Sequence, residues 1–295
     1  MKNKISVVIN FHNGEKYLEK CIESVLSQNY KNFEVILWDN ASVDSSKKII
    51  DKFKDKKIKY FRHSSKENLY KARNRAVEVS SGKLIAFLDC DDWWDKNYLS
   101  SKEKFFGLEE YDYFYSNVLC FYEKTNKLVK YNHKKLPNGK IYNYLAKDYF
   151  IIISGLIIKK KILEKENYFN GSYSIIGDYD LLMRISKYTN AKSFDEPMIY
   201  YRIHKNNFSK KNNKMYFEEY NHWFHNQKNL NNKLFQENIE HFHLRLSKLK
   251  IIHLLYKKRN FELFVEIIKF PQLSLKFKFF FAFFLPIQLI NFFRK

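Results

Sequence analysis

The chain is poor in residues that mark several common classes of protein. It has only 7 glycines among 295 residues. None of them form the GxGxxG motif of dinucleotide-binding dehydrogenases or the GxxxxGK[ST] motif of P-loop nucleotidases, so neither class is expected. The three cysteines, Cys21, Cys90 and Cys120, form neither a CxxC metal motif nor a disulfide framework. This spacing predicts a reducing, cytoplasmic environment.

Long hydrophobic runs are also missing, and no secretory leader is expected before the first apolar stretch at 5–9. The run 279–287 is too short to span a bilayer, which takes about 20 residues. The segment 271–295 is nevertheless rich in phenylalanine and has four cationic and no acidic side chains. We expect it to lie on an anionic membrane surface, placing the protein peripherally on the cytoplasmic face. The alternatives are packing on the protein's own surface and a dimer interface.

Acidic residues are scarce relative to basic ones, with 32 Asp and Glu against 53 Lys and Arg and a net charge of +21. Such an excess favours an anionic partner: nucleic acid, anionic lipid or a phosphorylated small molecule. The joint abundance of Lys, Asn, Ile, Phe and Tyr is equally typical of an AT-rich genome. Because an aromatic RNP strand and a GxxG clamp are both absent, a nucleic-acid partner is not expected.

The first hundred residues alternate between strand and helix patterns. Continuous apolar runs predict strands that are covered on both faces, and apolar residues at helical spacing predict the helices between them. The predicted strands are 4–10, 33–38, 58–61 and 83–88, and the predicted helices are 15–28, 44–54 and 69–80. A parallel, right-handed α/β sheet follows from this order.

The pattern becomes less regular after residue 100. An aromatic, strand-like stretch covers 111–123, and residues 178–188 have helical spacing. From about residue 214 the sequence is helical, and a polar stretch, KNNFSKKNNK, precedes it. We therefore expect two domains, an α/β domain at 1–210 and a helical C-terminal extension at 211–295.

Polar residues gather where three of the predicted strands end. Asp89, Asp91 and Asp92 follow one strand, and the loops 10–15 and 38–42 follow two others. Ligands of open α/β sheets bind beyond these carboxyl ends. Clustered carboxylates repel one another unless they are neutralised, and Mg²⁺ or Mn²⁺ is usually held by one or two carboxylates together with substrate phosphates. The cluster predicts a metal–diphosphate site; the alternative is a solvated acidic turn that caps the next helix.

Two tryptophans, Trp93 and Trp94, come directly after the acidic cluster. We expect both to serve in packing. The alternative is that one of them stacks on a sugar ring.

A resemblance to family 2 glycosyltransferases of the GT-A fold, of the bacterial cell-surface polysaccharide type, rests on three stretches. They are SVVINFHNGEKYLEKCIESVLSQNYKNFEVILWDNASVD, KARNRAVEVSSGKLIAFLDCDD and GDYDLLMR, and the likeness extends over about residues 4 to 205. The resemblance implies inverting transfer of a hexosyl or N-acetylhexosaminyl group. The donor would be a nucleotide-diphosphate sugar, expected to be a UDP-sugar, and the acceptor a hydroxyl of a glycan or lipid-linked molecule.

The resemblance also implies roles for the acidic residues of the donor site. Asp39 matches the acid that hydrogen-bonds the nucleotide base, with capping of the following helix as the alternative. Asp89 matches the residue that contacts ribose or, through water, the metal. Asp91 matches the metal ligand, for Mn²⁺ or Mg²⁺, and Asp92 is expected to support the cluster.

Further residues match the donor site less closely. Arg73, in the ARN element, is expected to contact pyrophosphate or ribose, or else to form a salt bridge on the helix surface. Asn10, His12 and Asn13 belong to the first nucleotide-binding loop, where Asn10 replaces the usual proline and His12 the usual aromatic residue. His204, in YYRIHKNNFS, is expected to bind the metal or the diphosphate; the alternative is a packed or exposed histidine.

The resemblance places the catalytic base at Asp178, which deprotonates the acceptor hydroxyl in an inverting displacement. Capping of a helix is the alternative role for this residue. Asp180 is expected to be its structural companion and Arg184 its anchor. Gly177 stands where the family usually has Glu. This departure favours a second hypothesis, a catalytically idle GT-A scaffold that binds a membrane or a protein partner.

Overall fold

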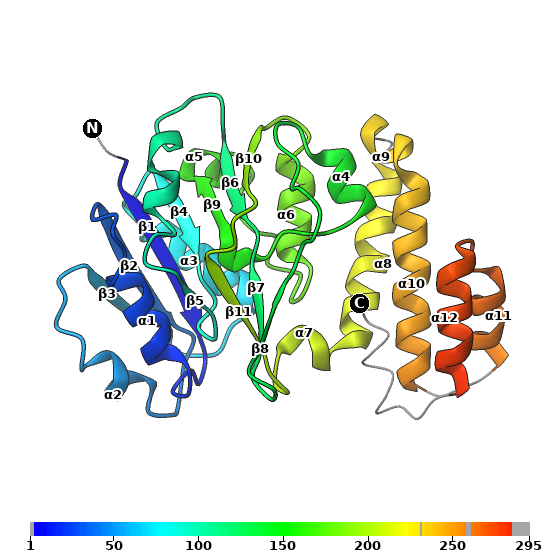
Figure 1. Cartoon of the computed structure of the whole chain (residues 1–295), viewed down its shortest axis with the longest axis horizontal. Helices are drawn as coiled ribbons and strands as arrows, with labels where there is room; N and C mark the ends of the chain where they lie inside the picture. The colour runs from blue at the N-terminus through cyan, green and yellow to red at the C-terminus, as the bar shows by residue number, and fades with distance from the viewer. Residues whose placement is uncertain (1–2, 231, 258–260, 285–295) are drawn as a thin grey trace. The chain divides into compact units, whose positions relative to one another are not determined.

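The computed structural model describes residues 3–230, 232–257 and 261–284. Its chain divides into two compact units, one ending at His204 and the other starting at Lys205. The division falls a few residues before the boundary near 210 that the polar stretch suggests. Figure 1 shows the α/β elements of the first unit and the helices of the second.

A seven-stranded sheet forms the centre of the first unit, in the order β10-β6-β9-β4-β1-β2-β3. Strands β1, β2, β3 and β4 are parallel to one another, whereas β9 runs antiparallel to both β4 and β6. The strands are β1 Ile5–Phe11, β2 Phe33–Asp39, β3 Ile58–Arg62, β4 Leu84–Phe87, β6 Tyr113–Ser116, β9 Leu156–Lys159 and β10 Ala191–Phe194. All residues of β1, β2 and β4 are buried, as their continuous apolar runs predict.

Three helices connect the parallel strands: α1 Leu18–Leu26, α2 Ser46–Ile50 and α3 Leu69–Glu78. Helix α3 begins after Asn68, whose side chain accepts a hydrogen bond from the backbone N–H of Tyr70. Helix α2 is much shorter than the predicted 44–54. Asp44 ties the preceding loop to the N–H groups of Glu15 and Ser46, and the chain after α2 is highly charged, with little apolar surface to bury.

A smaller four-stranded sheet has the order β5-β11-β7-β8. Its strands are β5 Trp93–Trp94, β7 Leu119–Tyr122, β8 Lys127–Lys130 and β11 Ile199–Ile203. The predicted strand 111–123 is therefore two strands, β6 and β7, in two different sheets. The chain changes sheet at Asn117, whose side-chain oxygen accepts hydrogen bonds from the N–H groups of Val118 and Asn132, each at 3.0 Å.

Short helices complete the first unit. They are the 3₁₀ segments η1 Ser100–Phe105 and η2 Ile153–Gly155, and the α-helices α4 Tyr142–Lys147, α5 Lys160–Lys165 and α6 Gly177–Ile185. Helix α6 corresponds to the predicted helix 178–188.

The second unit is helical throughout its described residues. Its helices are α7 Phe208–Lys211, α8 Asn213–Asn229, α9 Lys233–Glu237, α10 Ile239–Lys257, α11 Phe261–Lys269 and α12 Leu273–Phe284. Trp223, Phe235 and Phe242 pack together where α8, α9 and α10 meet. Leu263, Ile267 and other buried apolar residues form a further cluster of α10, α11 and α12. Within the described ranges, no helix is both long and apolar enough to cross a membrane.

Candidate functional site

Asp92 holds the acidic loop that follows β4. It is almost completely buried, and its carboxylate accepts hydrogen bonds from Ser154 Oγ at 2.5 Å and from the Arg202 N–H at 2.8 Å. Burial raises the pKa of Asp92 well above its usual range, and the nearby Asp91 and Asp89 add to this effect. These contacts attach the loop to η2 and to β11.

Asp89 forms an ion pair with Arg73, which comes from α3. The sequence alternative for Arg73 was a salt bridge on the helix surface. Arg73 is only 3% exposed, so the guanidinium is buried and not on that surface. Burial raises the pKa of Asp89, Arg73 opposes this rise, and the Asp91 and Asp178 carboxylates add to it. The charge of Asp89 is thus influenced by both other carboxylates as well as by Arg73.

Asp91 contacts His204, although 113 positions separate them in the sequence. The His204 Nε2 lies 2.9 Å from Asp91 Oδ2, and the imidazole packs against the Tyr17 ring with a centroid distance of 5.1 Å. Arg202 adds a hydrogen bond of 2.8 Å from its Nε to the Asp91 backbone oxygen. The two predicted metal ligands are thus adjacent.

A carboxylate and an imidazole are both ligands of divalent metal ions, and carboxylates are the usual ligands of Mg²⁺ and Mn²⁺. No cluster of three or more His, Cys, Asp or Glu side chains in the described part of the chain is arranged to hold a metal ion. Two protein ligands still fit such a cation, because Mg²⁺ and related ions commonly complete their shell with substrate phosphates and water. The residues present therefore fit a metal that binds together with a diphosphate.

Asp39 is fully buried at the end of β2. Its two carboxylate oxygens accept hydrogen bonds from the Ser42 N–H at 2.7 Å and from the Tyr60 hydroxyl at 2.8 Å. Burial, together with Asp39, raises the pKa of Tyr60 to about 12, so Tyr60 stays a donor. A bond from Asp39 to a nucleotide base would have to use a remaining lone pair.

The first loop is attached to the loop after β2. His12 Nδ1 lies 2.9 Å from the Asn40 backbone oxygen, and the Asn13 side chain accepts a hydrogen bond of 2.9 Å from the Val43 N–H. Asn13 has a φ of 56°, a left-handed conformation that Asn tolerates well. The Asn10 amide is buried without a hydrogen-bond partner among the described residues, as expected for a group that bonds a ligand.

Asp178 is the second residue of α6 and lies between two tyrosines. Tyr70 of α3 donates to Asp178 Oδ1 at 3.0 Å, and Tyr149 donates to Oδ2 at 2.8 Å. The N–H of Tyr179 is also 2.9 Å from Oδ1. The predicted base is therefore held by neutral donors on both oxygens.

Asp180 and Arg184 attach α6 to the segment after α5. Arg184 Nε lies 3.0 Å from Asp180 Oδ2, and the same guanidinium donates to the Glu166 carboxylate at 2.7 Å and to the Tyr168 backbone oxygen at 2.7 Å. Asp180 is thus paired with Arg184, and Arg184 fixes α6 to the segment 166–168.

Residues 6–166 match the profile of a known family, described as glycosyl transferase family 2. The chain belongs to this family. It is 30% identical over 208 residues to the UDP-Glc:alpha-D-GlcNAc-diphosphoundecaprenol beta-1,3-glucosyltransferase WfaP of Escherichia coli, covering 70% of this chain and 79% of the relative. It is also 40% identical over 130 residues to an uncharacterized glycosyltransferase of Rickettsia bellii. That match covers 43% of this chain and 18% of the relative.

Solved structures confirm the GT-A fold of this family 2 glycosyltransferase. TarS from S. aureus, in complex with UDP-GlcNAc, superposes with a TM-score of 0.60 at 19% identity, over 95% of this chain and 79% of TarS. The mannosyltransferase PcManGT from Pyrobaculum calidifontis, in complex with GDP-Man and Mn²⁺, also has a TM-score of 0.60, at 14% identity, over 84% of this chain and 72% of its own.

The two tryptophans of this glycosyltransferase pack against protein groups. Trp93 stacks on Tyr200 with a centroid distance of 4.9 Å, and the Lys20 ammonium lies 3.5 Å from the Trp93 ring centroid. Trp94 is buried and donates from Nε1 to the Ser154 backbone oxygen at 2.8 Å. Stacking on a sugar would require Trp93 to give up one of these partners.

Several site residues were missed from the sequence: Tyr70, Tyr149, Ser154 and Arg202. Tyr70 stands three positions before Arg73, and Arg202 two before His204, so closeness to the recognised elements was a usable signal for both. Nothing near Tyr149 or Ser154 in the sequence marks them, because their partners are far away along the chain.

Proposed function

We propose that this glycosyltransferase moves a sugar, with inversion, from a UDP-sugar donor to a hydroxyl of a lipid-linked glycan, with Asp178 as the general base. The observation that carries the proposal is a connected line of contacts. Asp178 bonds to Tyr70, the Tyr70 ring lies 5.2 Å from the Arg73 guanidinium carbon, and Arg73 pairs with Asp89. The proposed base is thereby connected with the proposed donor loop.

The proposed step is a single displacement. The acceptor hydroxyl gives its proton to the Asp178 carboxylate while its oxygen forms a bond to the anomeric carbon. The bond between that carbon and the diphosphate oxygen breaks, and its electron pair leaves with the nucleoside diphosphate. Inversion requires the base and the leaving group to lie on opposite sides of the sugar, and the proposal assigns them to different elements, α6 and the loop after β4.

Asp91 and His204 would hold the divalent cation. When bound, such a cation stabilises the negative charge that develops on the departing diphosphate. Arg73 neutralises part of the charge of Asp89, and Asp92 with Ser154 keeps the loop in place. The buried Asn10 amide is proposed to bond the nucleotide.

The substrate classes draw on the relatives. The name of WfaP specifies a UDP-Glc donor and a diphosphoundecaprenol-linked acceptor, and TarS has been solved with UDP-GlcNAc. We therefore propose that the transferred group is a hexosyl or N-acetylhexosaminyl group. An acceptor carried by a lipid also agrees with the exposed apolar side chains of α12.

The test combines binding with product analysis. Purified protein is titrated with UDP, UDP-Glc and UDP-GlcNAc, with and without Mn²⁺, and we expect at least one nucleotide sugar to bind in a metal-dependent manner. The protein is then given a polyprenyl-diphosphate-linked GlcNAc acceptor. The anomeric configuration of the product, read from its proton NMR coupling constant, should be opposite to that of the donor. Retained configuration would contradict the inverting mechanism. No metal-dependent binding to any donor would favour the idle scaffold.

The C-terminal helices are proposed to lie on an anionic membrane. Exposed apolar side chains of α12 recur every three or four residues and therefore lie along one side of the helix: Leu273, Phe277, Phe280, Phe281 and Phe284. On α11, Phe261, which is 80% exposed, and Ile268 are further exposed apolar side chains. Large exposed apolar side chains that gather on one side of a helix mark an interaction surface.

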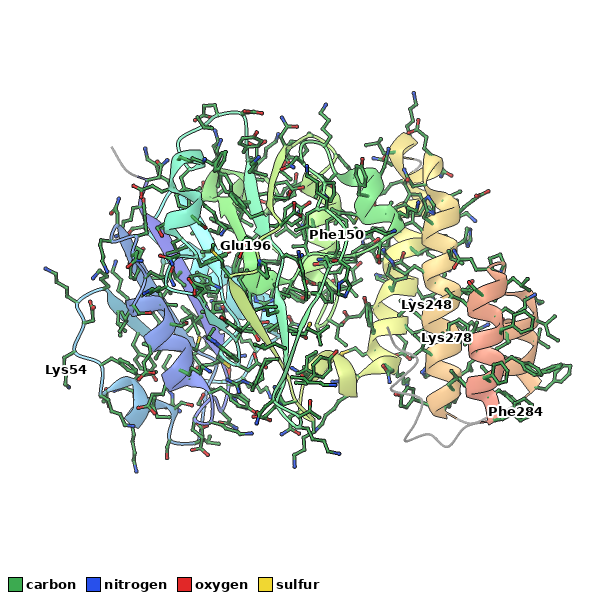
Figure 2. The ribbon with its side chains drawn as sticks, viewed as in Figure 1. Lys54, Phe150, Glu196, Lys248, Lys278 and Phe284 are labelled. Carbon is green, nitrogen blue, oxygen red and sulfur yellow. The ribbon has the colours of Figure 1, made fainter. Side chains whose placement is uncertain are left out.

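The charge around this surface fits anionic lipid. Lys276 and Lys278 stand among the phenylalanines, and α12 has no acidic residue. Lys278 and Phe284 are labelled in Figure 2. Basic residues among aromatic ones are typical of helices that lie in the interface of acidic membranes. The part of the predicted membrane segment at 285–295 lies outside the described residues, and the cytoplasmic side remains a prediction.

Vesicle flotation tests this surface. We expect binding to vesicles that contain phosphatidylglycerol, and weaker binding to pure phosphatidylcholine. The double variant Phe277→Ser and Phe281→Ser should release the protein, whereas Leu128→Ser, an exposed apolar residue of β8, should not. If the double variant instead changes the oligomeric state and leaves flotation unaltered, the surface is a contact between copies of the chain.

A further inference from the structure

Gly177 is needed for space. A Cβ atom at this position would lie 2.5 Å from Cδ2 and 2.6 Å from Cε2 and Cγ of the Tyr70 ring. Real Cβ atoms do not approach ring atoms so closely, so any other residue at 177 requires the ring to move. The family's usual Glu is therefore excluded by Tyr70.

The Tyr70 ring is fixed from several sides. It is 2% exposed, packs against Phe169 with a centroid distance of 5.4 Å, and lies under the Arg73 guanidinium. Its backbone N–H is bound by the Asn68 cap at 2.8 Å. A ring held in this way does not shift cheaply, because protein interiors are close-packed.

The Tyr70 hydroxyl reaches the proposed base. It lies 3.0 Å from Asp178 Oδ1 and 2.9 Å from the Ile175 backbone oxygen, so its one proton is shared between two acceptors. Burial raises the pKa of Tyr70 well above its usual value, and Asp178 adds to the rise. Tyr70 is therefore protonated at neutral pH and acts as a hydrogen-bond donor.

We propose that Tyr70 is the positioning residue of the base in this enzyme, and that its ring fills the space that a side chain at position 177 would take. The Tyr70 hydroxyl fixes the direction of the Asp178 carboxylate, with Tyr149 on its other oxygen. Because glycine has no Cβ, Gly177 leaves room for the Tyr70 ring in this arrangement. The inference rests on the proposed role of Asp178 as base, and it explains why a glycine at 177 is compatible with an active enzyme.

A phenol and a carboxylic acid differ in what they do beside a base. A second carboxylate brings a like charge, which disfavours ionisation of its neighbour. A protonated tyrosine brings a donor without charge, and it keeps a defined direction because its ring is rigid. Orientation of a catalytic group to within a fraction of an ångström has a large effect on rate.

Tyr70→Phe is the first test, because it removes the hydroxyl and keeps the ring. We expect kcat to fall about tenfold, the effect of losing one hydrogen bond to a charged group, with the KM values of donor and acceptor unchanged. Tyr115→Phe is the matched control: it removes another buried tyrosine hydroxyl, bonded to the Pro137 backbone oxygen, and should leave kcat unaltered.

Exchange of the two residues is the sharper test. Tyr70→Ala and Gly177→Glu should each lower kcat more than Tyr70→Phe, the first by freeing the carboxylate and the second by forcing the ring away. The double variant Tyr70→Ala with Gly177→Glu restores the family's acidic pair in the space left by the ring. We expect it to be about tenfold more active than either single variant.

The outcomes separate this inference from the proposed function. Tyr70→Phe with wild-type kcat, or a double variant no better than Tyr70→Ala, overturns the positioning role. Asp178→Asn with wild-type activity overturns the base assignment instead. Metal-dependent UDP binding and the thermal midpoint show whether each variant is folded; if the double variant is unfolded, the kcat and KM values of Tyr70→Phe decide alone.

Discussion

The loop after β4 and the start of α6 both present carboxylates, but they surround them differently. In the loop, Asp89 is paired with the Arg73 guanidinium and Asp91 with the His204 imidazole. On α6, Asp178 receives its side-chain hydrogen bonds from two neutral hydroxyls, those of Tyr70 and Tyr149.

The difference matches the proposed division of labour. The Arg73 guanidinium counteracts the rise in the pKa of Asp89 that burial causes, and a cation beside a carboxylate suits a loop that is proposed to lie at a diphosphate. A base must accept a proton during the reaction, and neutral donors orient it without opposing that step so strongly. Substitutions that change a partner or a charge in either region test this difference.

The largest effect is expected for Asp178→Asn, which keeps the size of the side chain and removes the proton acceptor. We expect kcat to fall by about 10²–10⁴, the usual contribution of a general base, while metal-dependent donor affinity is unchanged. Initial rates at saturating substrates and calorimetric UDP titration measure the two quantities. Asp51→Asn, at an exposed position beside α2, is the control. An equal loss of donor affinity would place Asp178 in the donor site instead.

Arg73→Gln tests the buried ion pair. It leaves Asp89 without its cation, and we expect the free energy of unfolding to fall by about 2–3 kcal/mol. This is below the range for a fully buried pair, because the Asp89 side chain is 35% exposed. Arg75→Gln in the same helix removes an exposed pair with Glu67 and should leave the urea midpoint unchanged. Similar losses for both variants would contradict the distinction between them.

Asp91→Asn should weaken UDP binding in the presence of Mn²⁺ by about 10–100-fold and leave metal-free binding nearly unchanged, because only the charge that holds the cation is lost. Isothermal titration at several Mn²⁺ concentrations measures this. The prediction fails if affinity falls equally with and without the metal.

Lys102 provides the most specific test, since its buried amine has neutral partners, as the Asp178 carboxylate has. Its ammonium donates to the Tyr98 backbone oxygen at 2.9 Å and to Ser101 Oγ at 3.1 Å. Burial lowers the pKa of Lys102 from 10.5 to about 7. Between these two pH values the unfolded chain keeps a proton that the folded chain has lost, so stability rises with pH in this window.

Lys102→Met should remove that rise. The unfolding free energy of the wild type should increase relative to the variant by up to about 1.4 kcal/mol per pH unit between pH 7 and 10. Urea unfolding at each pH unit measures the difference. Parallel pH profiles for the two proteins would show that Lys102 keeps its proton when folded.

Local patterns predicted much of the fold. The alternation of strands and helices up to β4, the helical second unit and the position of the acidic loop at a strand end all depend on nearby residues. The local patterns gave a wrong prediction where contacts between distant residues determine the path of the chain. At 111–123 one strand was predicted, but Asn117 bonds to the Asn132 N–H and the chain passes from one sheet to the other.

The sequence by itself determined which chemistry is present: a family 2 glycosyltransferase with carboxylates at the end of β4 and at the start of α6. Only the tertiary structure decided how each carboxylate is held. Tyr70 and Asp178 are 108 positions apart, and Asp91 and His204 are 113 apart. No periodicity along the chain reports such pairs, because they arise when packing brings separate elements together. That same packing gives Gly177, an apparent departure from the family, its physical reason.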